Sequence, residues 1–133
     1  MKHAHAERQL TNEDLRRRNE EIVWRFIVAD AAGDERRAIW DEDAVFELPL
    51  QGKVFRGREA ILARGRDSNQ TFRDFRYTDV IVYPMLDPNL FLVTHGSEEV
   101  LASGKTERNR YAQILELRGG KVVRRIEYHR LSD

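Results

Sequence analysis

The stretch NRYAQILELRGGKVVRRIEY, residues 109–128, consists of two alternating segments joined by a glycine-containing turn. Successive side chains of a strand point to opposite faces of a sheet, so each segment offers two candidate faces. The turn RGGK, residues 118–121, is short and polar, which is typical of a connection between antiparallel neighbours. The stretch therefore predicts a β-hairpin close to the end of the chain.

The residues before this hairpin continue the same pattern back to about residue 72. Two further runs, FRYTDVIVYPML at 75–86 and LFLVTHGSEEVLAS at 90–103, have strand composition. Turn residues follow each run, DPN at 87–89 and SGKTE at 103–107. Short turns between successive strands predict a four-stranded antiparallel meander.

Helical periodicity dominates the first part of the chain. Leu15, Ile22 and Phe26 recur at helical spacing in a predicted helix over about 12–32, with Thr11 as its N-cap. The predicted order continues with a stop at Gly33, a short helix from Asp34, a strand at 44–50, a short extended piece and a third helix from Arg58. Helices that precede antiparallel strands make the fold class α+β, with a sheet curved over the helices.

Length and charge limit the classes of function. The 133 residues predict one domain over 12–133 behind a disordered head at 1–11. The 23 basic and 23 acidic residues cancel, which predicts no binding of nucleic acid or of an anionic membrane. The absence of cysteine, of paired histidines and of a phosphate-binding glycine loop predicts no metal and no cofactor. With no recognisable signal or membrane span, we expect a cytoplasmic protein.

Composition chooses the inner face of only one long strand. The less charged and more apolar face of the third run is predicted to point inward, with Asn109, Tyr111, Gln113, Leu115 and Leu117. The last strand offers Val123, Arg125, Glu127 and His129 against Val122, Arg124, Ile126, Tyr128 and Arg130. The second run offers Thr94, Gly96 and Glu98 against His95, Ser97 and Glu99. In both of these strands composition leaves the inner face open.

Several segments in this order resemble one protein family. They are the opening helix, DEDAVFELP at 41–49, GREAI at 57–61 and the tail at 109–128. Together they resemble the SnoaL-like branch of the nuclear transport factor two-like superfamily, which includes ketosteroid isomerase and limonene epoxide hydrolase. The resemblance covers about residues 12–131. It implies a cone-like α+β barrel with a deep apolar pocket, often as a homodimer.

The resemblance also implies which residues face the pocket. The acid of E-Y resembles a pocket acid, so Glu127 would point inward, and alternation would carry Val123, Arg125 and His129 with it. Phe46 and Leu48 match positions of the cavity wall. The pocket positions of the second run fall on Thr94, Gly96 and Glu98. The chain departs from the epoxide hydrolases, because the position that resembles their arginine is Gly96.

Glu127 and His129 are the leading candidates for catalysis. Two residues apart on a strand, they would share a face at roughly 7 Å. In an apolar cone, desolvation would raise the pKa of the Glu127 carboxyl and make it a general acid or base at neutral pH, with His129 assisting. The other interpretation is an ion pair of Arg125 with Glu127, with His129 at the open end. The sequence leaves both interpretations open.

The remaining candidates carry similar alternatives. Glu98 is a second candidate acid, or else a solvated strand charge. Tyr111 and Asn109 are candidates to hold a substrate oxygen, although Tyr111 could simply be a wall of the cavity. Further predicted contacts to the ligand are Arg125, Phe46, Leu48, Trp24 and Gln113, with Trp24 and Trp40 expected in the core or the cavity floor.

These residues predict a function in acid/base chemistry. We expect a cofactor-independent isomerase, cyclase or hydrolase that acts on a small hydrophobic oxygenated molecule. The alternative is a non-catalytic ligand-binding or dimer-assembly module of the same fold, because this fold carries many functions.

Overall fold

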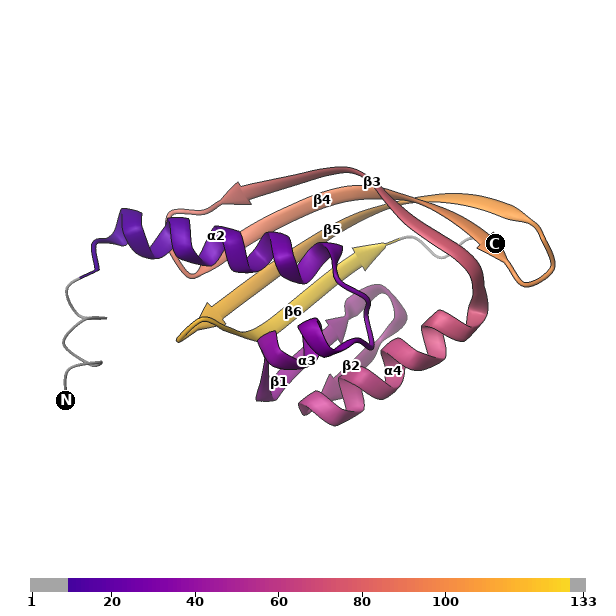
Figure 1. Cartoon of the computed structure of the whole chain (residues 1–133), viewed down its shortest axis with the longest axis horizontal. Helices are drawn as coiled ribbons and strands as arrows, with labels where there is room; N and C mark the ends of the chain where they lie inside the picture. Colours follow the sequence, from indigo (N-terminus) through magenta and orange to yellow (C-terminus); the bar gives the residue numbers. More distant parts are fainter. Residues whose placement is uncertain (1–9, 130–133) are drawn as a thin grey trace.

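The structure is a computed structural model that describes residues 10–129, three helices and a six-stranded mixed sheet (Figure 1). The helices are α2 (Asn12–Val28), α3 (Asp34–Ile39) and α4 (Arg58–Thr71). The strands are β1 (Trp40–Leu48), β2 (Lys53–Arg56), β3 (Phe72–Pro84), β4 (Leu90–Leu101), β5 (Thr106–Arg118) and β6 (Lys121–His129). The predicted α+β class is confirmed. Residues 1–9 of the predicted disordered head lie outside the described residues.

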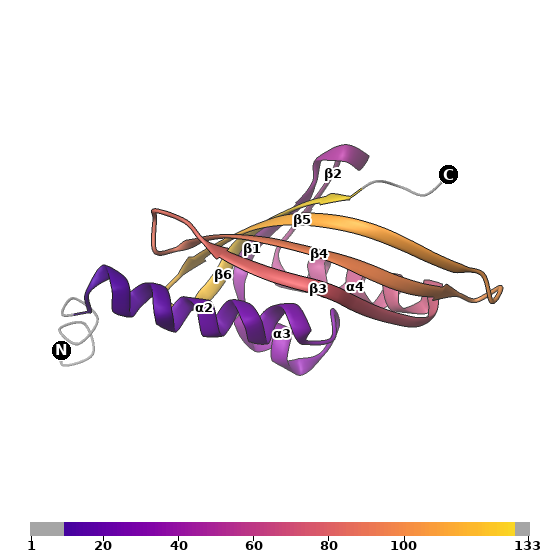
Figure 2. The same ribbon diagram turned by 90° about the horizontal axis from the view of Figure 1, so that it is seen from above.

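The strands form one open sheet in the order β2-β1-β6-β5-β4-β3. The predicted meander from β3 to β6 is confirmed, since each of these strands pairs antiparallel with the next. The earlier strand β1 pairs parallel with β6, so β6 lies in the interior of the sheet between β1 and β5. Figure 2 shows α2 and α3 together on one side of the long strands. Among the described residues, no helix is both long and apolar enough to cross a membrane.

Helix α2 begins as predicted and ends earlier than predicted. The Thr11 hydroxyl accepts a hydrogen bond from the Asp14 backbone N–H at 3.0 Å, which confirms the N-cap. The helix stops at Val28 rather than near residue 32. The buried guanidinium of Arg36 donates to the carbonyls of Phe26 and Ile27, at 2.8 and 3.3 Å, and thereby caps the last turn. Arg36 thus fixes the corner between α2 and α3.

The core lies between the helices and the inner face of the sheet. Trp40 is buried against Phe26, with ring centroids 5.0 Å apart in an edge-to-face arrangement. The prediction that Trp24 also lies in the core or lines the cavity is wrong, because Trp24 is 40% exposed. The buried stripe of α2 runs through Asn19, Ile22, Val23, Phe26 and Ile27. At 100° per residue, Trp24 points away from that stripe.

The inner face of the sheet agrees with the sequence in β5 and differs in two other strands. In β5 the predicted face is confirmed, since Gln113, Leu115 and Leu117 are buried. In β4 the buried side chains are Phe91, Val93, His95, Ser97 and Glu99, so the expectation that Thr94, Gly96 and Glu98 face the pocket is wrong. In β6 a bulge next to Glu116 and Leu117 buries Val122 in place of the expected Val123. After the bulge, Arg125, Glu127 and His129 point inward as expected.

Helix α4 approaches the α2–α3 connection closely at one glycine. A side-chain Cβ at Gly65 would lie 2.7 Å from the Ala31 carbonyl oxygen, so only glycine fits there without movement of the backbone. The contact fixes the face of α4 that carries Arg64 and Ser68 beside the inner surface of the sheet. This packing forms one wall of the pocket.

Candidate functional site

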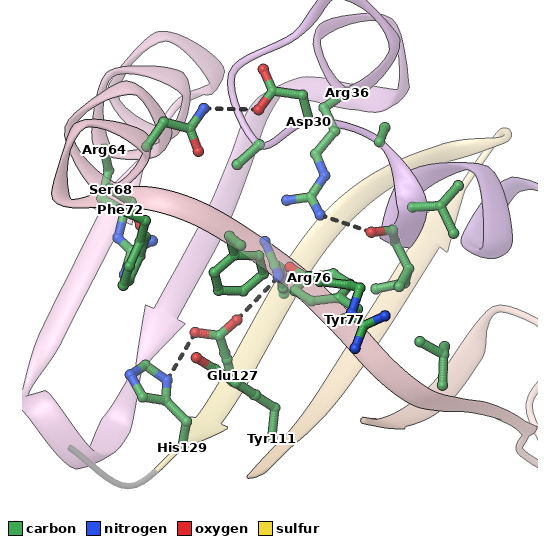
Figure 3. A pocket seen from close by; sticks show the side chains of 18 residues that line it. Asp30, Arg36, Arg64, Ser68, Phe72, Arg76, Tyr77, Tyr111, Glu127 and His129 are labelled. Carbon is green, nitrogen blue, oxygen red and sulfur yellow. Dashed lines mark hydrogen bonds and ion pairs between the residues drawn. The ribbon is translucent and has the colours of Figure 1, made fainter. Parts of the chain in front are cut away.

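A pocket of about 630 Å³ lies between the end of α2, helix α4, strand β3 and the inner face of β5 and β6 (Figure 3). Its apolar and aromatic walls include Ile27, Val28, Phe72, Phe75, Tyr77 and Val80. Its polar lining includes Arg36, Arg64, Ser68, Arg125, Glu127 and His129. The pocket therefore combines an apolar surface with a cluster of charged groups.

Glu127 lies at the centre of this cluster. It is 6% exposed and contacts two neighbours on its own strand. Arg125 donates from Nη2 to Glu127 Oε1 at 3.1 Å, and His129 Nδ1 lies 3.0 Å from the second oxygen, Oε2. The second contact is close enough for an ion pair, although the N–H direction is poorly aligned for a hydrogen bond. Each carboxylate oxygen thus has a nitrogen partner.

The pKa of Glu127 shifts in the direction opposite to the expected one. Burial by itself raises this pKa, but the charge of Arg125, the adjacent His129 and the charge of Arg64 together outweigh burial. The net result lowers the pKa from its ordinary value of 4.5 to about 2. The prediction of a raised pKa is wrong, because the sequence does not show how many cations surround the carboxylate. Glu127 is therefore ionised at neutral pH and cannot donate a proton there.

A second layer of hydrogen bonds holds Arg125 in place. Gln113 accepts from Arg125 Nε through its amide oxygen at 2.7 Å, and its amide nitrogen lies 2.7 Å from His95 Nε2. His95 Nδ1 lies 2.9 Å from the Gly96 carbonyl, which can only accept. We therefore assign the proton of neutral His95 to Nδ1, so that Nε2 accepts from Gln113. Burial lowers the pKa of His95, which agrees with a neutral ring.

The tautomer of His129 follows from a similar argument. The Gln51 amide nitrogen lies 3.1 Å from His129 Nε2. An amide nitrogen only donates, so in this arrangement Nε2 accepts and Nδ1 carries the proton that faces Glu127. His129 thus has a carboxylate beside Nδ1, while the lone pair of Nε2 accepts from Gln51. The geometry thus places an ionised carboxylate beside an imidazole in the wall of the pocket.

Glu99 is a buried acid that the sequence interpretation did not select. Its carboxylate accepts hydrogen bonds from Ser97 at 2.9 Å, Asn109 at 3.0 Å and Tyr111 at 2.8 Å. Burial raises the pKa of the Tyr111 phenol, so the phenol stays protonated and donates to Glu99. Asn109 and Tyr111 were predicted to hold a substrate oxygen, but in the structure both donate to this carboxylate. The available signal was the alternative face His95, Ser97 and Glu99, which composition had left open.

The neighbouring acid, Glu98, points away from the pocket. Its carboxylate pairs with Arg76 at 2.6 Å and with Arg108 at 3.8 Å. The side chain is 36% exposed, in agreement with the solvated strand charge that was the alternative interpretation. Alternation explains the result, because adjacent residues of a strand cannot both face inward.

Aromatic rings cross the inner face of four strands. The chain of contacts runs Tyr77–His95–Tyr111–His129, with centroid separations of 4.3, 4.7 and 4.9 Å. Register explains the alignment, since His95 pairs with Tyr111 and Tyr111 with His129. Tyr111 therefore fixes the His129 ring by direct contact at the pocket wall.

Other predicted ligand contacts lie behind the pocket surface. Phe46 and Leu48 are each 2% exposed and belong to the core, and Gln113 is fully buried beneath Arg125. Residues at the pocket that the sequence interpretation missed include Arg36, Arg64, Ser68 and Tyr77. Their elements meet only in the tertiary structure. Among the described residues, no group of three histidine or acidic side chains is arranged to hold a metal ion.

The chain is similar in sequence to known proteins. A SnoaL-like domain profile matches residues 21–125, and the uncharacterised protein YesE of Bacillus subtilis (strain 168) is 30% identical over 95 residues. That match covers 68% of this chain and 65% of YesE, just under two thirds of the relative's length.

Solved structures share the fold at lower identity. A phenazine biosynthesis-related protein from Pseudomonas aeruginosa superposes with a TM-score of 0.78 at 24% identity, covering 90% of this chain and 83% of that one. A putative polyketide cyclase from Xanthomonas campestris gives 0.79 at 21%, covering 87% and 93%. A protein of ketosteroid isomerase-like fold from Catenulispora acidiphila, in complex with trimethylamine, gives 0.71 at 17%, covering 84% and 87%. The chain therefore belongs to the SnoaL-like family, and the resemblance inferred from its motifs is confirmed.

Proposed function

We propose that this chain is an enzyme that transfers a proton on a small oxygenated molecule held in the pocket. The observation that carries the proposal is the contact of His129 Nδ1 with the ionised Glu127 at 3.0 Å, on the pocket wall. The fold it shares with proteins described as polyketide cyclases and as ketosteroid isomerase-like supports the same class of chemistry.

The proposed step uses His129 as the base. A carbonyl substrate displaces the Gln51 amide from Nε2, and Nε2 takes a proton from the carbon next to the carbonyl. The products of this step are an enolate and an imidazolium, and the Glu127 carboxylate stabilises the imidazolium. Where a carbon–carbon double bond is conjugated with the enolate, return of the proton from the imidazolium to the far end of that conjugated system completes an isomerisation. Attack of the enolate carbon on a second carbonyl forms a carbon–carbon bond and an alkoxide, and the alkoxide takes the proton back from the imidazolium to complete a cyclisation.

Arg125 acts through Glu127 in this proposal. The guanidinium keeps the carboxylate ionised and in one orientation, while Gln113 holds the guanidinium. The apolar walls formed by Ile27, Phe72 and Val80 suit a hydrophobic substrate body. Burial of that body would exclude water from the imidazole.

The experiment is deuterium exchange of simple ketones followed by proton NMR. The wild-type protein is incubated in D₂O with cyclohexanone, 2-indanone and 2-tetralone, and loss of the signal next to the carbonyl is timed. We expect catalysed exchange of at least one ketone, and a loss of about 10²- to 10⁴-fold in His129→Gln, the usual contribution of a general base. Glu47→Gln, which changes an acid paired with Arg124 outside the pocket lining, is the matched control.

The alternative is a ligand-binding module. It is favoured by one observation, that Glu127, Arg125 and Gln113 already have protein partners, as a purely structural ion pair would. Binding of the ketones with exchange no faster than in buffer would support that alternative. Exchange at the same rate in His129→Gln would remove the histidine from the mechanism.

We also propose that two copies of the chain pair through the outer face of the sheet. Register aligns Tyr83, Leu92, Ile114 and Ile126 across four adjacent strands of that face. Tyr128 lies beside them and is 40% exposed. A continuous apolar strip of this kind favours a protein partner, and a second copy would cover it.

A further inference from the structure

Cationic groups outnumber carboxylates in the pocket. The lining contains four arginines, Arg36, Arg64, Arg76 and Arg125, against two carboxylates, Asp30 and Glu127. Three of the arginines have partners. Arg36 donates to backbone carbonyls, Arg76 pairs with Glu98, and Arg125 pairs with Gln113 and Glu127.

Arg64 differs from these three. Its guanidinium makes no hydrogen bond and no ion pair with any described residue. Its contact is with the Phe46 ring, whose centroid lies 5.7 Å from Cζ. A guanidinium carries five N–H donors in a fixed fork and matches the two oxygens of a carboxylate. Arg64 therefore presents an unused anion-binding group at the pocket wall.

The position of Arg64 is fixed by the fold. Ser68 follows one helical turn later on α4, so the two side chains lie on the same face of the helix and both line the pocket. Gly65 holds that helix against Ala31. Figure 3 shows Arg64 and Ser68 coming from α4, while Glu127 and His129 come from β6. A ligand that spans the pocket would meet both pairs.

The charge around Glu127 supports the same conclusion. Arg125 lies over the same Phe46 ring that Arg64 contacts, with the Cζ of Arg125 4.7 Å from the ring centroid. The charges of both Arg64 and Arg125 act on Glu127, and that of Arg125 also acts on the buried Arg36. The charge of Glu127 acts in turn on Arg36, so this carboxylate interacts with the guanidinium groups of Arg36, Arg64 and Arg125. A bound anion would reduce this excess of partly buried positive charge.

We propose that Arg64, with the Ser68 hydroxyl, is an anion-binding subsite, and that the molecule taken by the pocket is a small organic carboxylate with an apolar or aromatic body. The carboxylate lies on Arg64, and the body lies against the aromatic wall of β3. The proposal deepens the proposed function, because it names the substrate class of the same pocket, and it rests on that function only for the chemistry at His129.

The test compares two probes of nearly equal shape, 2-naphthoate and 2-naphthamide. Their affinities for the wild-type protein, Arg64→Gln and Arg66→Gln are measured by proton NMR titration. Arg66 is exposed on the same helix and outside the pocket lining, so its variant removes the same charge from α4. We expect the wild type and Arg66→Gln to bind the carboxylate at least about tenfold more tightly than the amide, since charge-assisted paired hydrogen bonds are about twice as strong as neutral ones. Arg64→Gln should bind the two probes equally.

Three outcomes would overturn the proposal. They are a wild type without preference for the carboxylate at millimolar probe, a preference that persists in Arg64→Gln, and a preference that Arg66→Gln loses equally. Because binding is measured without turnover, the result is independent of ketone exchange. A preference for the carboxylate without ketone exchange would support the subsite and remove the proposed catalysis. Ketone exchange without a preference for the carboxylate would support the proposed catalysis and remove the subsite.

Discussion

Replacement of Glu127 by glutamine removes one buried charge and nearly preserves shape. Glu127 is 6% exposed, and its two oxygens contact Arg125 and His129. A neutral amide in place of the carboxylate would leave the Arg125 guanidinium buried without its counter-ion. Loss of one partner of a buried pair costs about 3–5 kcal/mol, so we expect Glu127→Gln to lower the free energy of unfolding by about that amount at pH 7.

The pH dependence gives a sharper expectation. Folding lowers the pKa of Glu127 from 4.5 to about 2, which at about 1.36 kcal/mol per pH unit corresponds to about 3 kcal/mol. A carboxyl whose pKa is lower in the folded state stabilises the protein above its unfolded pKa. That stability is lost as the pH falls from about 4.5 through about 2. By pH 3 about 2 kcal/mol of it should be gone.

The assay is urea unfolding followed by circular dichroism at pH 7, 5, 4 and 3 for the wild type and Glu127→Gln. We expect the difference in the free energy of unfolding to stay constant down to about pH 5 and then to shrink by about 2 kcal/mol by pH 3. Glu47→Gln is the control, because Glu47 forms an exposed pair with Arg124 that contributes less than about 1 kcal/mol. A Glu127→Gln curve parallel to the wild type between pH 5 and pH 3 would refute the assignment of an ionised, ion-paired Glu127.

Three other expectations follow from the same geometry. Tyr111→Phe removes one of the three donors to Glu99 and should lower the free energy of unfolding by about 1–3 kcal/mol in urea titrations. Glu98→Gln should change that free energy by less than about 1 kcal/mol, and equal losses in the two variants would contradict the assigned faces of β4. Because burial lowers the pKa of His95, its nitrogen-15 NMR titration should have a midpoint below the ordinary 6.5, with the proton on Nδ1 in the neutral form; a midpoint above 6.5 would contradict the burial. Light scattering should give twice the 15.7 kDa of one chain for the wild type and about the single mass for Ile114→Lys, and a monomeric wild type would refute the paired outer faces.

The order and type of the elements could be predicted from the chain alone. Polar turns separate long alternating runs, and these features are local, so four antiparallel strands followed directly. The inner face of β5 was also predictable, because its two faces differ clearly in charge. The end of α2 was not, because Arg36 from the next helix caps it at Val28.

The candidate site was only partly predictable. Alternation identified Arg125, Glu127 and His129 as one set, and the resemblance to SnoaL-like proteins placed that set inside. Alternation could not choose between Glu98 and Glu99, because both faces of β4 carry polar residues. Nor could it locate the bulge in β6, since the pairing with β5 sets it.

The sequence by itself determined the fold family, the order of the strands along the chain and which residues could share a face, since these depend on local periodicity and turn chemistry. Only the tertiary structure decided the chemical state of the site. Alternation already placed Arg125 beside Glu127, but the burial of the carboxylate, the approach of Arg64 from α4 and the contacts of His129 with Tyr111 and Gln51 come from the tertiary structure. Electrostatic energy depends on distance in space and on burial, and neither of these is written in the spacing of residues along the chain.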